Sequence, residues 1–141
     1  MSDLIIIDGD QAEFNPSFGL ATVVVRLGEI KGSGHSSLQG KKVCIVGDET
    51  SVSVPGCIYI TPIYSLPGIG TLKIDVLGDD QIAQKTNSVA TPMILKGSTF
   101  IAKFEVQTPA FTPPPISVPD AVPQYSGTGN FITMNTKWRG T

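Results

Sequence analysis

Short apolar runs that end in glycine and an acidic residue are the feature of this sequence that most constrains its fold. They occur four times in the first 80 residues, as LIIIDGD, VVVRLGE, KKVCIVGDE and LKIDVLGDD, with glycines at Gly9, Gly28, Gly47 and Gly78. Branched side chains favour strands, and glycine accepts the positive φ angles of tight turns. Since this is also a common way to end any strand, the copies indicate either ordinary turns or an imperfect, pseudo-symmetric repeat.

The rest of the chain also predicts strands. Residues 72–77 and 99–106 alternate between apolar and polar side chains, as strands with one covered face do. Residues 58–64 predict an edge strand or a bulge, because Pro62 cannot donate to a sheet. The only helical signal, at 79–87, suffices for one turn. The sequence therefore predicts an all-β fold, with further strands at 4–7, 22–27 and 43–46.

Composition excludes several classes of protein. The net charge of −2 and the absence of a basic cluster argue against a nucleic-acid partner. No apolar run approaches the roughly 20 residues of a membrane-spanning helix. The N-terminal segment lacks the features of a secretory signal, so we expect a cytoplasmic protein that, if it leaves the cell, does not use that route. Cys44 and Cys57 do not make a disulfide framework and are expected to be reduced.

Two regions of different composition predict the domain organisation. Residues 1–108 predict a β domain, and residues 109–141 a C-terminal extension. Six of the eleven prolines fall between Pro109 and Pro123, which predicts an extended, semi-rigid segment. The apolar residues beyond it suggest a terminal strand that folds back onto the domain, or a segment that docks onto a partner.

Catalytic groups are scarce. His35 is the only histidine, and GHSSL around it does not match the nucleophile elbow of hydrolases. The acid pairs at 48–49 and 79–80 are typical of solvated turns. We therefore expect a protein that is not an enzyme.

A family resemblance adds to this interpretation. VRLGEIKGSGH, KKVCIVGDETS and VPGC resemble the proline-alanine-alanine-arginine (PAAR) repeat family, and PMILKGSTFIAKFEVQTPA resembles the closing strands of PAAR-like proteins of contractile injection systems. The resemblance covers roughly residues 8–110. It implies a small conical β fold with pseudo-threefold character, which caps a trimeric β-helical spike such as the valine-glycine repeat protein (VgrG) of type VI secretion. It also implies transient contact with a target membrane and, in some members, a toxin effector or its adaptor as a partner.

The resemblance suggests candidate contact residues. A single chain can cap a trimer if it offers three similar strand ends. We place them near 22–27, 43–46 and 72–77, which makes the predicted partner-binding residues Val24, Leu27, Val43, Ile45, Leu72, Ile74 and Val76. The side chains expected to fill the tip are Tyr59, Tyr64, Leu66 and Ile69.

Two predictions, that of no cofactor and that of a spike-capping function, each have an alternative. The resemblance to PAAR proteins implies a metal ion at the tip, held by several histidines and a cysteine. This chain has only one histidine and cannot supply that set of ligands. We expect no cofactor, and the alternative is a zinc ion held by His35 and Cys57 with help from Cys44, Asp48 or water. The alternative function is a small β-sandwich that binds carbohydrate or mediates adhesion, which would need aromatic side chains exposed on one face.

Overall fold

The structure is a computed structural model that describes residues 3–38, 40–88 and 91–141. Apart from two short 3₁₀ turns, η1 (Asp48–Ser51) and η2 (Asp79–Gln81), its regular elements are strands, so the all-β prediction is confirmed. The strands are β1 (Asp3–Leu4), β2 (Gln11–Phe14), β3 (Ser17–Phe18), β4 (Ala21–Val23), β5 (Gly28–Glu29), β6 (Ser37–Leu38), β7 (Lys41–Lys42), β8 (Ser53–Ile60), β9 (Gly68–Val76), β10 (Ile82–Ser88), β11 (Thr91–Ile94), β12 (Phe100–Thr108), β13 (Gln124–Ile132) and β14 (Arg139–Gly140).

One curled antiparallel sheet forms the body of the molecule. Its eight strands follow the order β3-β4-β8-β9-β12-β13-β2-β5. The curl brings β3 against β13 and β5 against β8, so the two ends of the sheet approach its middle strands. The inner face therefore encloses the core.

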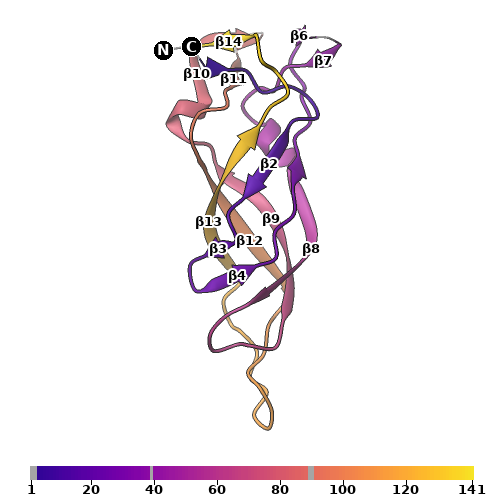
Figure 1. The fold of residues 1–141 in the computed structure, drawn as a ribbon, viewed down its shortest axis with the longest axis vertical. Helices are drawn as coiled ribbons and strands as arrows, with labels where there is room; N and C mark the ends of the chain where they lie inside the picture. The colour runs from indigo at the N-terminus through magenta and orange to yellow at the C-terminus, as the bar shows by residue number, and fades with distance from the viewer. Residues whose placement is uncertain (1–2, 39, 89–90) are drawn as a thin grey trace.

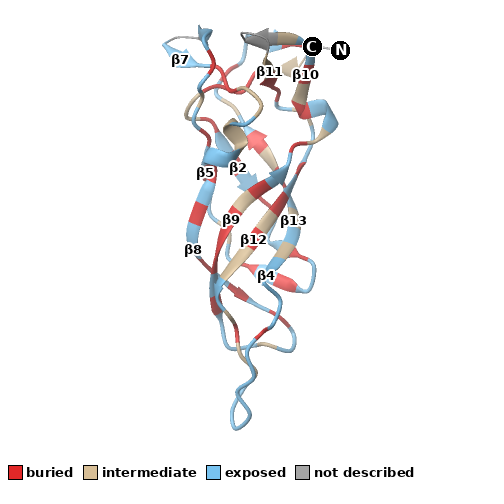
Figure 2. Ribbon diagram, turned by 180° about the vertical axis from the view of Figure 1, so that it is seen from behind, coloured by how far each residue is buried: buried red, intermediate tan, exposed pale blue. Residues whose placement is uncertain are grey.

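Aromatic side chains fill the curl. Alternate residues of β12 point inward, and Phe100 and Phe104 are fully buried, as the period-two pattern predicts. The Phe100 ring meets Phe131 at a centroid distance of 5.1 Å, and the Phe104 ring meets Tyr59 at 5.2 Å. Figure 2 shows buried and exposed residues alternating along the long strands. Large rings from β8, β12 and β13 therefore pack against one another on the inner face of the curled sheet.

The C-terminal region returns to the sheet. The chain leaves β12 at Thr108, runs through residues 109–123, and comes back as β13. That strand pairs with β12 on one side, where Phe104 faces Tyr125, and with β2 on the other, where Ala12 faces Phe131. The segment expected as an extension, 109–141, thus contributes an interior strand.

The two ends of the molecule differ in shape (Figure 1). The end that we call blunt carries three two-stranded ribbons, β1–β14, β6–β7 and β10–β11. Residues 3 and 140 pair there, so both ends of the described chain lie at the blunt end. The end that we call narrow consists of the loops 61–67 and 109–123 and the turn between β3 and β4. Among the described residues, no helix has the length and apolar character to cross a bilayer.

Candidate functional site

Three extended segments, 4–10, 42–48 and 92–98, meet at the blunt end around one axis. Their central residues are Ile6, Cys44 and Ile94. The Ile6 N–H donates to the Ile94 carbonyl, the Ile94 N–H to Cys44, and the Cys44 N–H to Ile6, each at 2.9 Å. These three bonds close a ring.

A second ring repeats the arrangement one step outward. In each case, the N–H two residues after a central residue donates to the carbonyl two residues before another central residue. The pairs are Asp8 to Lys42 at 2.7 Å, Val46 to Pro92 at 2.9 Å, and Lys96 to Leu4 at 2.8 Å. Three different stretches of one chain thus occupy equivalent positions, and the predicted pseudo-threefold character is present.

Each segment ends in a turn at a glycine with positive φ. The angles are 87° at Gly9, 111° at Gly47 and 51° at Gly97, a region that glycine enters at little cost. The equivalent glycines are therefore Gly9, Gly47 and Gly97, whereas Gly28 and Gly78 belong to other turns.

The acid after the glycine caps the turn. A carboxylate oxygen of Asp10 accepts the Ile7 N–H at 2.8 Å, and one of Asp48 accepts the Ile45 N–H at 2.9 Å. The third segment has Ser98 in this place, and the corresponding Leu95 N–H donates to the backbone oxygen of Gln81 at 2.8 Å. In the Gly-Asp motif, the aspartate thus accepts a hydrogen bond from a backbone N–H that the turn would leave without a partner.

The rings separate two apolar clusters. The central side chains join the main core, and their neighbours point to the other side, as alternation in an extended chain requires. This second cluster is buried and contains Ile5, Ile7, Val43, Ala83, Met93 and Leu95. Burial, followed by the negative charges of Asp48 and Asp10, raises the pKa of the Cys44 thiol well above its usual value. Cys44 is therefore an unreactive packing residue in a buried apolar region.

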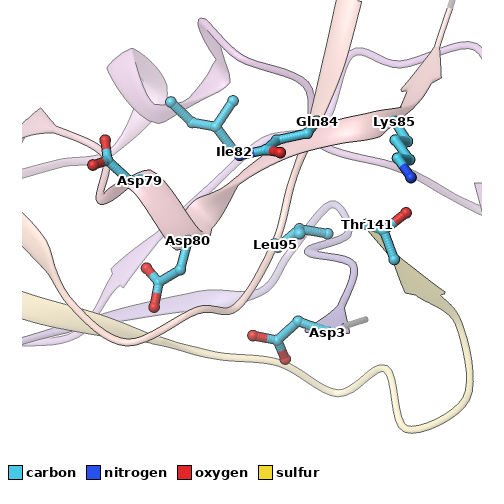
Figure 3. A pocket seen from close by; sticks show the side chains of 8 residues that line it. All are labelled: Asp3, Asp79, Asp80, Ile82, Gln84, Lys85, Leu95 and Thr141. Atoms are coloured by element: carbon cyan, nitrogen blue, oxygen red, sulfur yellow. The ribbon is translucent and has the colours of Figure 1, made fainter. Parts of the chain in front are cut away.

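A groove opens beside β1 and β10 at the blunt end (Figure 3). Its volume is about 520 Å³, and Asp3, Asp79, Asp80 and Lys85 line it together with apolar and hydroxyl side chains. The Asp3 carboxylate accepts the N–H groups of Leu4 and Gly97, each at 2.8 Å, and Asp80 accepts that of Ser98 at 2.9 Å. Asp3 therefore links the start of the first segment to the third segment, and Asp80 links η2 to the third segment.

The predicted contact residues fall into three places. Val43 and Ile45 lie in the pseudo-threefold layer, by which we mean the three segments 4–10, 42–48 and 92–98 that form the two hydrogen-bonded rings. Leu72 and Ile74 are buried on β9, inside the protein's own core. The exposed members are Val24, Leu27 and Val76, on the sides of the body. The layer is built from 4–10, 42–48 and 92–98, so of the three expected segments only 43–46 contributes to it.

The predicted zinc pair does not fit a metal site. His35 is exposed in the loop before β6, next to Gly34, whose N–H donates to Val43 at the blunt end. Cys57 is buried on β8 opposite Gly70, and its thiol donates to the Val54 carbonyl at 3.5 Å. Within residues 3–38, 40–88 and 91–141, no three His, Cys, Asp or Glu side chains are grouped as metal ligands. A tetrahedral zinc site needs about four donors.

A buried carboxylate that the sequence analysis missed anchors the narrow end. Asp120 is only 6% exposed, and it accepts the hydroxyl of Tyr59 at 2.9 Å, that of Tyr125 at 2.6 Å and the N–H of Val122 at 3.0 Å. The Tyr59 hydroxyl in turn accepts the Ala110 N–H at 3.0 Å. The network ties the loop 109–123 to β8 and β13. A signal was present, since Asp120 is the only charged residue in 106–136.

A family model decides the identity. The model described as contractile injection system spike tip protein matches residues 1–141, the whole chain. The chain belongs to this family. Comparison with individually curated proteins gives no match.

The geometry of this spike tip protein agrees with that assignment. A pseudo-threefold end opposite a narrow end is the shape that a tip on a trimeric shaft requires. The alternative of a carbohydrate-binding module finds little support, because Trp138 is the only exposed aromatic side chain among the described residues. Most of the other aromatic side chains are buried in the core, and Tyr64, Phe111 and Tyr125 are partly buried.

Proposed function

We propose that the blunt end of this spike tip protein caps the end of a trimeric β-helical spike of the VgrG kind. The observation that carries the proposal is the double ring of equivalent hydrogen bonds among 4–10, 42–48 and 92–98. A homotrimer presents the same surface three times. A single chain can match all three subunits only if it repeats its own surface about the same axis.

The ribbons are the elements that would meet the spike. Each of the three leads directly into one segment of the ring, β1 into 4–10, β7 into 42–48 and β11 into 92–98. The ends of a β-helical shaft expose unpaired strand edges, which favour pairing with added strands. One ribbon per subunit satisfies those edges, and the buried cluster behind the rings keeps the three ribbons in place.

This placement gives the molecule a direction. With the blunt end on the shaft, the narrow end points forward and the injection apparatus carries the protein out of the cytoplasm. The role is structural rather than catalytic. A toxin effector or its adaptor, if loaded, would contact the sides of the body, where Val24, Leu27 and Val76 are exposed.

Site-selective blocking tests the capping proposal. Both natural cysteines are buried, so a cysteine introduced at an exposed position can be coupled selectively to a polyethylene glycol maleimide. Lys42→Cys places the polymer on the β6–β7 ribbon, and Ile116→Cys places it at the narrow end. Native mass spectrometry with a purified trimeric spike then reports the stoichiometry.

The expected result is one tip per three spike subunits for the unlabelled protein and for labelled Ile116→Cys, with loss of the complex for labelled Lys42→Cys. The proposal fails if the unlabelled protein never gives a one-to-three complex. It also fails if the polymer at the narrow end, and not that at the ribbon, blocks assembly.

A further inference from the structure

The three ribbons of the blunt end are equivalent in register as well as in position. We call each segment of the pseudo-threefold layer, together with its ribbon, a copy. In every copy the residue two positions before the central residue pairs across the ribbon, and the pairs are Leu4 with Arg139, Lys42 with Ser37 and Pro92 with Asn87. Counting along the chain from these pairs therefore assigns equivalent positions on the partner strands β14, β6 and β10.

A basic residue stands at the same position in all three copies. It lies two positions before the residue that is paired on the partner strand, and the three residues are Lys137, His35 and Lys85. All three are exposed. Since the chain has 10 Lys and Arg residues and 1 His among its 141 residues, a basic residue in every copy seldom arises by chance. We call these three residues the basic set.

The other charges of the blunt end are not repeated in this way. Two groups of equivalent positions each hold one acid, one base and one neutral residue. They are Asp3, Lys41 and Thr91, three positions before the central residues, and Asp8, Lys96 and Val46, two positions after them. A partner that presents the same charge three times would meet one attraction and one repulsion in each group, and would gain nothing from either.

The acids of the copies are used inside the protein. Asp10 and Asp48 are equivalent, but each carboxylate accepts a backbone N–H of its own turn, and the third copy has Ser98 at this position. The Asp3 carboxylate likewise accepts the N–H groups of Leu4 and Gly97. Among the described residues of the three segments and their ribbons, the basic set is thus the one ionisable position that all three copies share.

We propose that each subunit of the spike presents a carboxylate, from Asp or Glu, to one residue of the basic set. The inference rests on the capping proposal and adds the chemistry of the partner to it. A homotrimer repeats its charges three times, so only a charge that the tip repeats equally can be complemented at every subunit. One exposed ion pair contributes little, but three pairs act together, steer the encounter and fix the register of the tip on the spike.

Salt and paired charge reversals test the inference with the full-length protein and its trimeric spike. Biolayer interferometry should show the affinity falling by about tenfold between roughly 0.05 M and 0.5 M sodium chloride, because salt screens exposed ion pairs. The double variant Lys85→Glu with Lys137→Glu should weaken the complex by at least about tenfold at low salt, since two of the three attractions become repulsions.

The double variant Lys41→Glu with Lys96→Glu is the matched control. It changes the net charge by the same amount, at the same end of the molecule and again at exposed residues, but neither position is basic in the other copies. We expect it to bind within about twofold of the wild type.

The outcomes separate this inference from the capping proposal. Absence of a one-to-three complex of the unaltered protein in native mass spectrometry would overturn both together. A one-to-three complex that is insensitive to salt, that tolerates reversal of Lys85 and Lys137, or that both double variants weaken equally would overturn the inference and leave capping intact.

Discussion

Replacement of Tyr59 by phenylalanine should reveal how the narrow end is held. The substitution keeps the ring, which packs against Phe104 at 5.2 Å, and removes only the hydroxyl. Two interactions are lost. The Asp120 carboxylate loses a donor, worth about 1.5–3 kcal/mol, and the Ala110 N–H, which is fully buried, loses its acceptor at a further cost of about 1–3 kcal/mol. We expect Tyr59→Phe to lower the free energy of unfolding by about 3–5 kcal/mol.

Tyr125→Phe is the matched comparison. Its hydroxyl donates to the same carboxylate, no buried N–H of the described residues donates to it, and the residue is only partly buried. We expect a loss of about 1–2 kcal/mol. Urea unfolding followed by circular dichroism measures both variants, and a gap of about 2 kcal/mol should separate their midpoints by roughly 1 M. Equal midpoints, or a larger loss for Tyr125→Phe, would refute the argument that the hydroxyl of Tyr59 serves two buried partners.

Three further outcomes are expected. Removal of residues 109–141 should abolish cooperative unfolding, because β13 lies between β12 and β2; a truncated protein that still melts cooperatively would contradict this role. Gly47→Ala should cost about 1–2 kcal/mol in thermal melts, since its φ of 111° is strained for alanine although space is open around it, and an unchanged melting temperature would exclude that strain. Burial, with Asp120, raises the pKa of Tyr59 to about 12. Since an unfolded tyrosine titrates near 10, the unfolded state binds fewer protons above that pH, and stability should fall between pH of about 10 and 12, less so in Tyr59→Phe.

Local patterns in the sequence predicted two of the long strands well, whereas the strand expected at 22–27 ends at Val23 and the one expected at 43–46 forms only isolated bridges. The alternation at 99–106 and 72–77 corresponds to β12 and β9, whose inward residues fill the core. The signal at 79–87 corresponds to the short turn η2, followed by β10. The strands β12 and β9 follow from side-chain periodicity, which is a property of a few neighbouring residues, whereas β10 was not predicted.

The repeat was harder to recognise. Gly9 and Gly47 are followed by an acid that caps their turns, but Gly97 is followed by Ser98, and the backbone carbonyl of Gln81 takes the place of the acid as acceptor. The third copy therefore lacks the residue that marks the other two. Gly28 and Gly78 are also followed by an acidic residue but do not belong to the pseudo-threefold layer, because the same motif ends ordinary strands.

The C-terminal region could not be placed from composition. Prolines at 109–123 predict a stretch that does not pair along its length, but the return of the chain as β13 depends on β2, more than a hundred residues earlier. Pairing between segments so far apart cannot be recognised from the pattern of a few neighbouring residues. The Asp120 network is of the same kind, since it joins residues from β8, the loop and β13.

The pairing of Asp3 with Gly140 sets a rule for engineering. If the blunt end caps a spike as proposed, a passenger protein fused next to either of these residues would lie between the tip and the spike and compete with assembly. A passenger spliced into the loop around residues 113–117 would instead travel in front (Figure 1). On the same proposal, the loop around residues 113–117 is the better insertion site for a passenger than positions next to Asp3 or Gly140.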